Sequence, residues 1–231
     1  MARLRFSTKG LICSRPCVRR SARFFTPGRG MYIPKHFDVT DRDEVLAFIE
    51  ANAFGQLVSS VAGRPFSTHM PFLLSQDMTT CSGHLAKQNP QHRELAGQQV
   101  LISLQGPHDY ISPSWYAAPG VPTWNYQAVH IYGQCRVFSD HEKLKTVVDA
   151  LTARYESGFE KPWSPEYKGS MLDGIVGVEV AVSEIQCKYK LSQNRSRQDR
   201  LQVTEQLEKL GSTDLAAAMR RNQAQIIRRR L

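Results

Sequence analysis

Three short segments of this chain carry hydroxyl, imidazole, amide and cationic side chains at a density that could bind a ligand. Residues 66–72 (FSTHMPF) place hydroxyl and imidazole groups inside an apolar stretch. Residues 82–91 (SGHLAKQNPQ) run from the end of a predicted strand into the start of a predicted helix, and residues 191–196 (LSQNRS) follow the last predicted strand. These groups form hydrogen bonds and bind anions, so they indicate a binding site more directly than a hydrolytic one.

The middle segment has the composition of a phosphate site. Pro90 suits the first position of a short helix over 90–96 that ends at Gly97, so the segment predicts a corner where a strand meets a helix. Helix N-termini offer free N–H groups to anions, Lys87 would add a positive charge, and Asn89 and Gln91 would add neutral donors. An ordinary capped corner with a solvated lysine is an equally good interpretation of the same residues.

Tryptophans and histidines supply a second group of candidates. Residues 106–122 contain four prolines and two glycines, which predicts a long irregular connection, and long connections in compact domains are often functional. Trp115 and Trp124 could be core aromatics, but their polar and rigid neighbours favour a site. His69 and His84 could either contact a ligand or be structural, hydrogen-bonded histidines.

Other chemistries find no support in the sequence. It shows no pair of carboxylates, no Cys–His pair and no cluster of metal-ligand residues with the spacing that hydrolytic or zinc catalysis needs. We therefore predict no metal site.

The net charge of +9 is concentrated at the two ends of the chain. Residues 1–30 hold eight Arg or Lys and no acid, and residues 220–231 hold five Arg and no acid, whereas residues 31–219 have a net charge of −4. The total charge therefore does not predict a DNA-binding face on the folded part. We expect residues 1–30 to be a basic leader, either disordered or upstream of a misassigned start at Met31, although their composition also fits a mitochondrial transit peptide.

Five cysteines form an odd set. Cys13 and Cys17 are too few for a zinc site, and Cys81, Cys135 and Cys187 lie in predicted strands, where free cysteine behaves as a small apolar residue. This usage, with no apolar run long enough for a membrane span, predicts a soluble cytoplasmic protein.

Hydrophobic patterns predict a mainly β fold with accessory helices. We expect strands over about 56–61, 66–75, 79–85, 100–104, 124–138 and 175–189, and helices over about 41–52 with Thr40 as N-cap, 140–156, 196–210 and 213–221. Strands and helices do not alternate regularly, so an open or closed antiparallel barrel is favoured over a parallel sheet. The apolar phase of the last strand slips by one residue after Val182, which predicts a β-bulge.

The strand over 124–138 has two different faces. One alternate set (Val129, Ile131, Gly133, Cys135, Val137) suits a packed core. The other is aromatic and polar (Trp124, Tyr126, Ala128, His130, Tyr132, Gln134, Arg136). A strand that faces water seldom carries so many aromatic residues, so we expect this face to meet a ligand or a second subunit.

Six segments together resemble the PaiB-type family of FMN-binding negative transcriptional regulators. They are residues 31–37, 68–72, 83–91, 110–116, 121–130 and 190–195, in unbroken order over about 31–210. The chain has Met70 where the family has Leu, and Lys87 where it often has Arg. The resemblance implies an FMN-binding split β-barrel, related to pyridoxamine-phosphate-oxidase-like proteins, over residues 31–210, followed by a C-terminal helix and arginine-rich tail over 211–231.

The resemblance also implies roles for particular residues. FMN would lie at the interface of a homodimer, with Lys87 and its neighbours holding the phosphate and Thr68, His69 and Met70 lining the ring system. Trp115, Trp124 and Asn125 would close the site, from the second subunit in one arrangement, and the run with Gln193 and Asn194 would reach the flavin edge or fix a covering loop. The cofactor-binding set is thus Thr68, His69, Met70, His84, Lys87, Asn89, Gln91, Trp115, Trp124, Asn125, Gln193 and Asn194.

The implied function is that of a flavoprotein that represses transcription. No helix-turn-helix signature is visible, so DNA contact would come from the arginine tail, from surface patches or through a partner. A flavin-dependent oxidoreductase or a haem-handling split-barrel protein is the alternative, and a cofactor-free dimeric module is a third.

Overall fold

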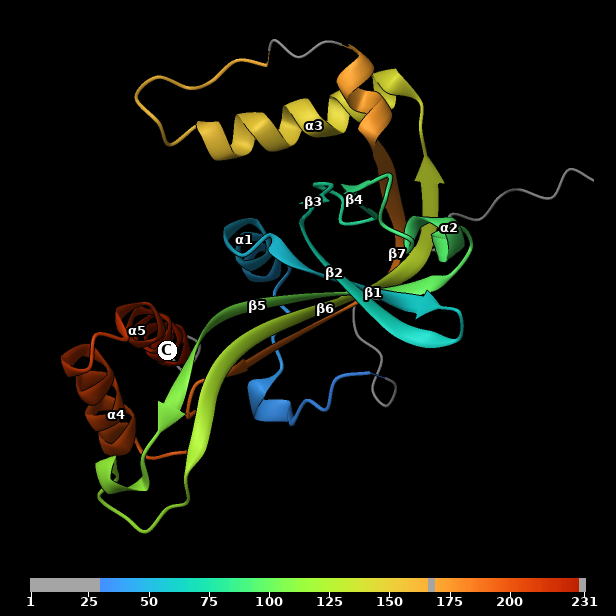
Figure 1. Cartoon of the computed structure of the whole chain (residues 1–231). Coiled ribbons are helices and arrows are strands. Elements are labelled where there is room, and N and C mark those ends of the chain that lie inside the picture. The colour runs from blue at the N-terminus through green and yellow to red at the C-terminus, as the bar shows by residue number, and fades with distance from the viewer. Residues whose placement is uncertain (1–29, 166–168, 229–231) are drawn as a thin grey trace, which may run out of the picture.

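The computed structural model describes residues 30–165 and 169–228, with side chains up to residue 225. The expectations for residues 1–29, including Cys13 and Cys17, lie outside the described residues. Figure 1 shows a curved sheet with helices at its edges and across one face.

A single sheet of seven strands dominates the described chain, in the order β2-β1-β5-β6-β7-β4-β3, and all its strand pairs are antiparallel. This confirms the mainly β prediction. The strands are β1 (Phe54–Val61), β2 (Arg64–Pro71), β3 (Leu73–Leu74), β4 (Thr80–Ala86), β5 (Gln99–Ile111), β6 (Thr123–Phe138) and β7 (Ile175–Lys190).

The sheet curls until β4 meets the end of β2. A Cβ on Gly83 of β4 would overlap the Met70 methyl group and the Pro71 carbonyl oxygen, so only glycine permits this close approach. The apolar residues of β1, β5, β6 and β7 fill the interior, where Leu57, Ile102 and Ile131 are fully buried. The result is the predicted barrel.

The predicted bulge lies in β7. Tyr132 pairs with Glu184 and Gly133 with Val182, so Ser183 is the extra residue where the apolar phase slips. A second bulge was missed. β5 continues to Ile111 instead of ending at Leu104. Gly106 and Pro107, between Gln105 and His108, form the bulge and leave the hydrogen-bonded ladder, and Pro107 has no N–H that would need a partner there.

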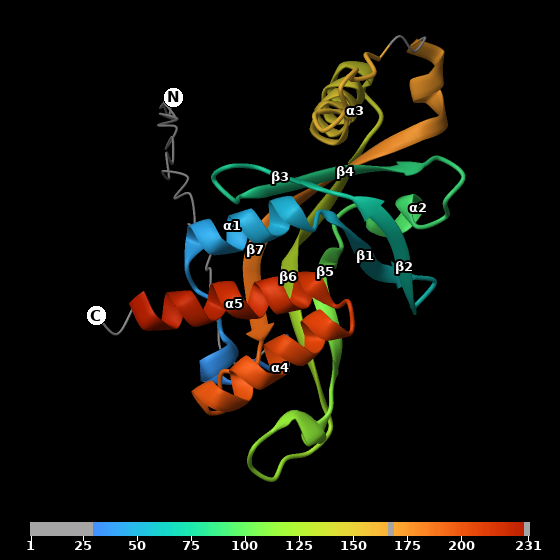
Figure 2. The ribbon, with the colours of Figure 1, turned by 90° about the vertical axis from the view of Figure 1, so that its left-hand side faces the viewer.

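Helices pack outside the sheet. They are α1 (Arg42–Ala51), α2 (His92–Leu95), α3 (His141–Glu156), α4 (Arg197–Lys209) and α5 (Thr213–Arg228), with 3-10 turns η1 (Lys35–Phe37), η2 (Pro113–Trp115) and η3 (Gly169–Gly174). Figure 2 shows α1 in blue, then α5 and α4 in red, across one face of the sheet. None of the helices in the described ranges is long and apolar enough to cross a membrane.

Several element boundaries differ from the sequence prediction. Asp41, not Thr40, caps α1, because its Oδ1 accepts a hydrogen bond from the Glu44 N–H at 3.0 Å. β2 ends at Pro71, because the Phe72 N–H turns to the Ala53 carbonyl at 2.9 Å. α5 runs to Arg228 rather than stopping at Arg221, so the helix continues beyond the residues predicted for it.

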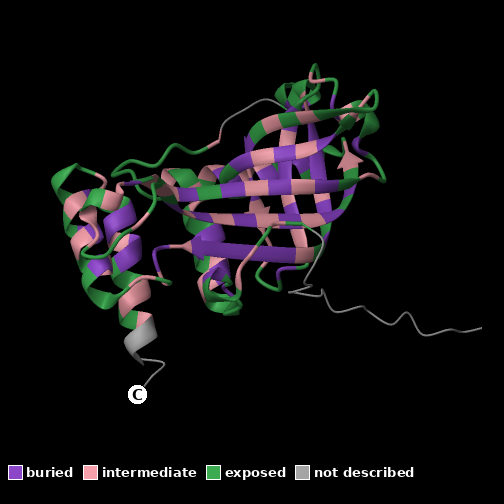
Figure 3. Cartoon of the chain, turned by 90° about the horizontal axis from the view of Figure 1, so that it is seen from below, coloured by how far each residue is buried: buried purple, intermediate pink, exposed green. Residues whose placement is uncertain are grey.

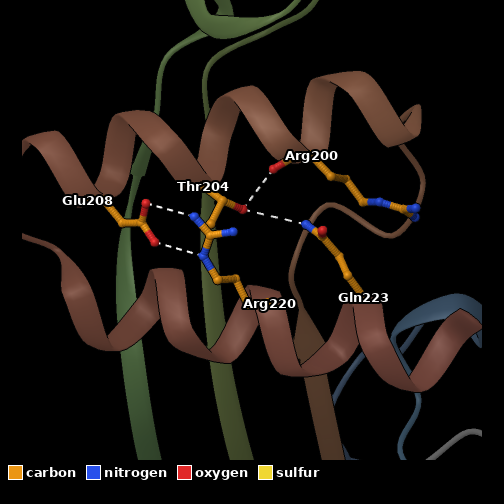
Figure 4. A network of polar contacts seen from close by, with 5 residues as sticks. All are labelled: Arg200, Thr204, Glu208, Arg220 and Gln223. Atoms are coloured by element: carbon orange, nitrogen blue, oxygen red, sulfur yellow. Dashed lines mark hydrogen bonds and ion pairs between the residues drawn. The ribbon is translucent and has the colours of Figure 1, made fainter.

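The pair of helices at the C-terminus is braced by polar contacts (Figure 4). Arg220 of α5 donates two hydrogen bonds of 2.8 Å to the two carboxylate oxygens of Glu208 on α4. Thr204 of α4 donates to the Arg200 carbonyl at 2.8 Å and accepts from Gln223 of α5 at 3.5 Å. Arg220 therefore joins α5 to α4.

Candidate functional site

Lys87 lies at the predicted corner, directly after the end of β4. Its side chain is exposed and makes no ion pair with any carboxylate of the described residues. Its N–H donates to the Gly174 carbonyl at 2.8 Å, which ties the corner to the start of β7. The ammonium group is thus available to an anion while its backbone is fixed.

Three predicted site residues meet beside Lys87 in one hydrogen-bonded group. The Thr68 hydroxyl donates to Gln91 Oε1 at 2.6 Å and accepts from Asn89 Nδ2 at 2.8 Å. Gln91 is completely buried, and its Nε2 donates to the Leu57 carbonyl at 3.0 Å and to Ser59 Oγ at 2.9 Å. Because both amide hydrogens of Gln91 are used, its side chain has no donor left for a phosphate, and its role in the corner is to position Thr68 and Asn89.

The helix that was expected to offer N–H groups is shorter than predicted. α2 has only four residues, and two of the N–H groups before it, those of Asn89 and Gln91, are occupied within the chain. Asn89 N–H donates to the Ala86 carbonyl at 2.9 Å, and Gln91 N–H donates to Asn89 Oδ1 at 3.0 Å. The positive charge of Lys87, rather than a helix N-terminus, is therefore the main attraction for an anion at this corner.

Thr68, His69 and Met70 do not share a face. Consecutive strand residues point to opposite sides of a sheet, and Met70 is buried while His69 is exposed. Within one chain, the His69 side chain therefore lies on the opposite side of β2 from those of Thr68 and Met70. His69 instead lies beside Phe54, with ring centroids 6.4 Å apart and planes 26° apart, and the Phe54 side chain is 61% exposed.

His84 on β4 has an unsatisfied nitrogen. Its Nδ1 is buried and has no hydrogen-bond partner in the part of the chain that the structure describes. Burial lowers the pKa of His84, so the neutral ring is favoured. A buried ring nitrogen without a partner is costly, and a ligand atom or a water could satisfy it.

The aromatic residues of β6 are exposed or only partly buried, on the side of the strand opposite to its buried set. Figure 3 shows a side of the curved sheet with no helix of the described chain lying across it. Trp124 is 53% exposed, and its ring lies 6.2 Å from that of Tyr110 and 6.4 Å from that of His108. Further along the strand, His130 and Tyr132 are 6.1 Å apart. We call this surface the open face; it comprises Trp124, Tyr126, Ala128, His130 and Tyr132 with their neighbours Val58, Leu101 and Ser103 on β1 and β5.

The remaining predicted residues lie away from Lys87. The loop between β5 and β6, which carries Trp115 and leads into Trp124, lies at the opposite end of the molecule from β4 and α2 (Figure 2). Asn125 is buried on the side of β6 that faces away from Trp124, and its Nδ2 donates to Ser192 Oγ at 2.9 Å. One chain therefore does not bring the tryptophans to the Lys87 corner, and Asn125 cannot close a site on the open face.

Gln193 and Asn194 follow β7 in the same distant region. The Gln193 amide stabilises its own loop, because its Oε1 accepts from the Leu191 N–H at 2.7 Å and its Nε2 donates to the Tyr189 carbonyl at 2.5 Å. This geometry fits the loop-fixing role that the resemblance implied. Asn194 is exposed.

Two features were missed by the sequence prediction. Phe54 was left outside the strand although it stands exposed beside His69. A cavity of about 900 Å³ between α1, α5 and the sheet was also unforeseen. Its one signal in the sequence was Gln127, a polar residue in the buried phase of β6.

Comparisons with known proteins now decide the family. Residues 31–184 match the family model described as "Putative FMN-binding domain". The chain belongs to this FMN-binding family. It is also 44% identical over 186 residues to the Bacillus subtilis "Protease synthase and sporulation protein PAI 2", covering 77% of this chain and 89% of that protein. An uncharacterized protein of Aspergillus fumigatus is 33% identical over 71% of this chain and 86% of its own length.

Solved structures support the fold. The flavocytochrome Anf3 of Azotobacter vinelandii aligns with a TM-score of 0.59 and 15% identity, over 76% of this chain and 80% of its own. The FAD and heme binding protein of Mycobacterium smegmatis aligns with a TM-score of 0.56 and 14% identity, over 71% of this chain and 78% of its own. At these identities the likeness shows the split-barrel fold alone.

The residues on the surface fit FMN, the cofactor of the family. The Lys87 ammonium is free of carboxylates and suits a phosphate, and the exposed pair of Phe54 and His69 offers a flat surface for a ring system. The His84 Nδ1 supplies a polar atom in need of a partner. The assignment of individual site residues stays a prediction.

Because burial favours the neutral ring of His84, we predict that the free energy of unfolding depends on pH. Its pKa is lowered in the native state from the ordinary value of 6.5, so the unfolded chain binds the proton first as the pH falls. The native state then loses stability as the pH falls through the ordinary value and below it. We expect the free energy of unfolding in urea to fall less steeply from pH 7.5 to pH 5 in His84→Leu than in the wild type, by on the order of 0.5 kcal/mol per pH unit because the ring is only partly enclosed. Parallel pH profiles for the two proteins would refute this.

Proposed function

We propose that the protein is a homodimeric FMN-binding regulator, in which each flavin has its phosphate at the Lys87 corner of one chain and is enclosed by the open face and the tryptophan loop of the other. The observation that carries this proposal is the separation of the predicted site residues. The connection from β4 to α2, which carries Lys87, lies far from the loop between β5 and β6, the tryptophan loop, which carries Trp115 (Figure 2). A twofold partner would supply the missing wall.

The phosphate end of the proposed site rests on the rigidity of the corner. The Lys87 backbone is fixed to Gly174, and Asn89 is fixed through Thr68 and the buried Gln91. A cation held on a fixed backbone binds a phosphate with less loss of conformational entropy than one on a mobile loop. Lys87 provides a point charge, whereas the Arg found often in the family would provide a planar fork.

The dimer contact rests on the character of the open face. Val58, Leu101 and Tyr132 form a row across three strands, and all three are only partly buried in the single chain. Aromatic residues that stand half-exposed on an uncovered sheet are typical of subunit interfaces. Burial already lowers the pKa of His130 on this face, so the ring is favoured in the neutral form that an interface needs.

FMN would supply reversible electron or hydride transfer, and the residues of this chain bind, orient and enclose it. A regulatory role is supported by the relative named for protease synthase and sporulation. The net charge of −4 over residues 31–219 argues for an effect through a partner or through flavin state rather than through a basic face on DNA. The buried free thiols of Cys81, Cys135 and Cys187 support a reducing location, for which we propose the cytoplasm.

Removal of the Lys87 charge tests the phosphate assignment. In Lys87→Ala, the dissociation constant for FMN should rise about 5- to 100-fold, because one charge-assisted contact is lost, while the melting temperature of the FMN-free protein stays the same. Fluorescence titration of FMN measures the affinity. Lys209→Ala, on the distant helix α4, is the matched control and should bind as the wild type does. Unchanged affinity in Lys87→Ala would show that the phosphate lies elsewhere.

A charge on the open face tests the dimer. Leu101→Glu should convert the dimer to a monomer in analytical ultracentrifugation and release FMN, because an unpaired carboxylate would be buried at the contact. Leu201→Glu places the same change on exposed α4 and should leave both properties unaltered. A dimer that survives Leu101→Glu with FMN bound would exclude this face as the interface.

The absorption spectrum separates the proposal from its alternatives. Purified protein should be yellow, with about one FMN per chain, and NADH or NADPH should not bleach it within minutes. Rapid bleaching would indicate a flavin-dependent oxidoreductase, and a Soret band would indicate a haem-handling protein. Colourless protein that takes up no FMN would indicate a cofactor-free module and contradict the proposal.

A further inference from the structure

We infer that Lys188 and Lys190 of β7 form an anion site beside the open face, which takes a small aromatic molecule with one acidic group, a carboxylate or a phosphate. In the ladder, Lys190 pairs with Tyr126 and Lys188 pairs with Ala128. Residues that pair across two strands point to the same side of a sheet, so both lysines stand on the side of the open face. We call Lys188 and Lys190 the lysine pair.

The ammonium group of Lys188 is enclosed by protein. The residue is 7% exposed, and its Nζ donates to the Tyr32 carbonyl at 2.7 Å. The same Nζ lies 5.5 Å from the ring centroid of Tyr32 and 5.2 Å from that of Tyr126. A carbonyl and two aromatic faces attract a cation, but they do not neutralise its charge. Lysines are almost never buried without an ion pair, so Lys188 indicates an anion as its partner.

Lys190 stands two residues further along the same strand and is only partly buried. Its Nζ donates to Thr123 Oγ1 and to the Trp124 carbonyl, which are both neutral acceptors. Burial lowers the pKa of Lys190, and the charge of Lys188 lowers it further, so the two ammonium groups repel each other. An anion in contact with both lysines would offset this repulsion.

Carboxylates of the described chain do not neutralise the lysine pair. Neither ammonium group makes an ion pair with any acid among the described residues. Asp38 is the backbone bridge partner of Lys188, but burial raises the pKa of Asp38, whereas an ion pair with Lys188 would lower it. Glu184, on the same side of β7, lies four residues from Lys188, about 13 Å along the strand.

Both ammonium groups have N–H donors for a ligand. An ammonium group carries three donors. Within the described chain, one donor of Lys188 is bonded to Tyr32, and two donors of Lys190 are bonded to Thr123 and Trp124. The remaining donors can bond to the oxygens of a carboxylate or a phosphate, and such charge-assisted hydrogen bonds are the strong ones.

Aromatic side chains beside the lysine pair provide a surface for the ring of the ligand. Tyr126 forms one row across three strands with His108 and Lys190, and Trp124 forms the next row with Tyr110. The rings of Trp124 and Tyr110 lie 6.2 Å apart, and both residues are exposed. Exposed aromatic faces next to two cations favour an aromatic anion over an inorganic one.

The lysine pair is separate from the Lys87 corner. The corner lies between β4 and α2, whereas β7 ends toward the opposite end of the molecule, near the tryptophan loop (Figure 2). One chain supplies both lysines and the aromatic surface, so the site does not depend on the dimer or on FMN. In the proposed dimer the open face would enclose this second ligand together with the flavin.

Calorimetric titration of the full chain, loaded with FMN, tests the site. Benzoate and phenyl phosphate are the anionic probes, and benzyl alcohol is an uncharged probe with the same ring. We expect at least one anion to bind about tenfold or more tightly than benzyl alcohol, and the tighter anion identifies the acidic group. Lys190→Met should weaken both anions about five- to tenfold and leave benzyl alcohol unchanged. Lys188→Met should act in the same way and serves as a second variant if Lys190→Met folds poorly.

Lys143→Met is the matched control. Lys143 also holds its ammonium group over an aromatic ring, 4.4 Å from the centroid of Phe138, but it forms an ion pair with Glu179 at 2.8 Å. The affinity for both anions should be unchanged in Lys143→Met. Equal affinity for all three probes, no binding of any probe, or equal weakening in Lys143→Met would overturn the proposal.

The FMN content of the variants separates this site from the flavin site. It should stay at the wild-type level in Lys190→Met and Lys188→Met. Loss of FMN in both variants would show that the lysine pair holds the phosphate of the cofactor, and would also overturn the proposal. Unchanged FMN affinity in Lys87→Ala would refute only the phosphate assignment at the corner, so the two proposals fail separately.

Discussion

The alternation of side chains along β6 is the constraint on which the rest of the molecule depends. Its inner set closes the barrel core at Val129 and Ile131 and lines the cavity at Gln127. Its outer set forms the open face. Because the period of a strand is two residues, a shift of one position would exchange core and surface, so the pairing of β6 with β5 and β7 determines where every candidate site can lie.

The bulges allow that pairing to coexist with a curved sheet. Ser183 lets β7 change phase opposite Tyr132, so that Val182 and Ile185 both remain buried. Gly106 and Pro107 do the same for β5, which then carries Tyr110 beyond the barrel to meet Trp124. Without these extra residues the long strands would need either polar atoms in the core or apolar ones in water.

Much of the fold could be predicted from the sequence, because apolar periodicity is local. The two faces of β6, the slip in β7 and the buried cysteines were all visible in single segments. The ends of β2 and β5 were not, because they depend on partners distant in sequence: Ala53 for Phe72, and Trp124 for Tyr110. The order of six motif segments was sufficient to identify the family, since a chance match over that length is improbable.

The candidate site was harder to predict, because polar residues close together in sequence can bond to one another as readily as to a ligand. Asn89 and Gln91 have the donors a phosphate needs, but their side chains bond to Thr68 of β2 instead. Thr68 is distant from them in sequence, so no local sequence pattern shows these bonds. Lys87 differs because the described chain offers its ammonium no carboxylate. The buried amide of Gln91 thus organises the corner, and the positive charge of Lys87 next to it remains for a ligand.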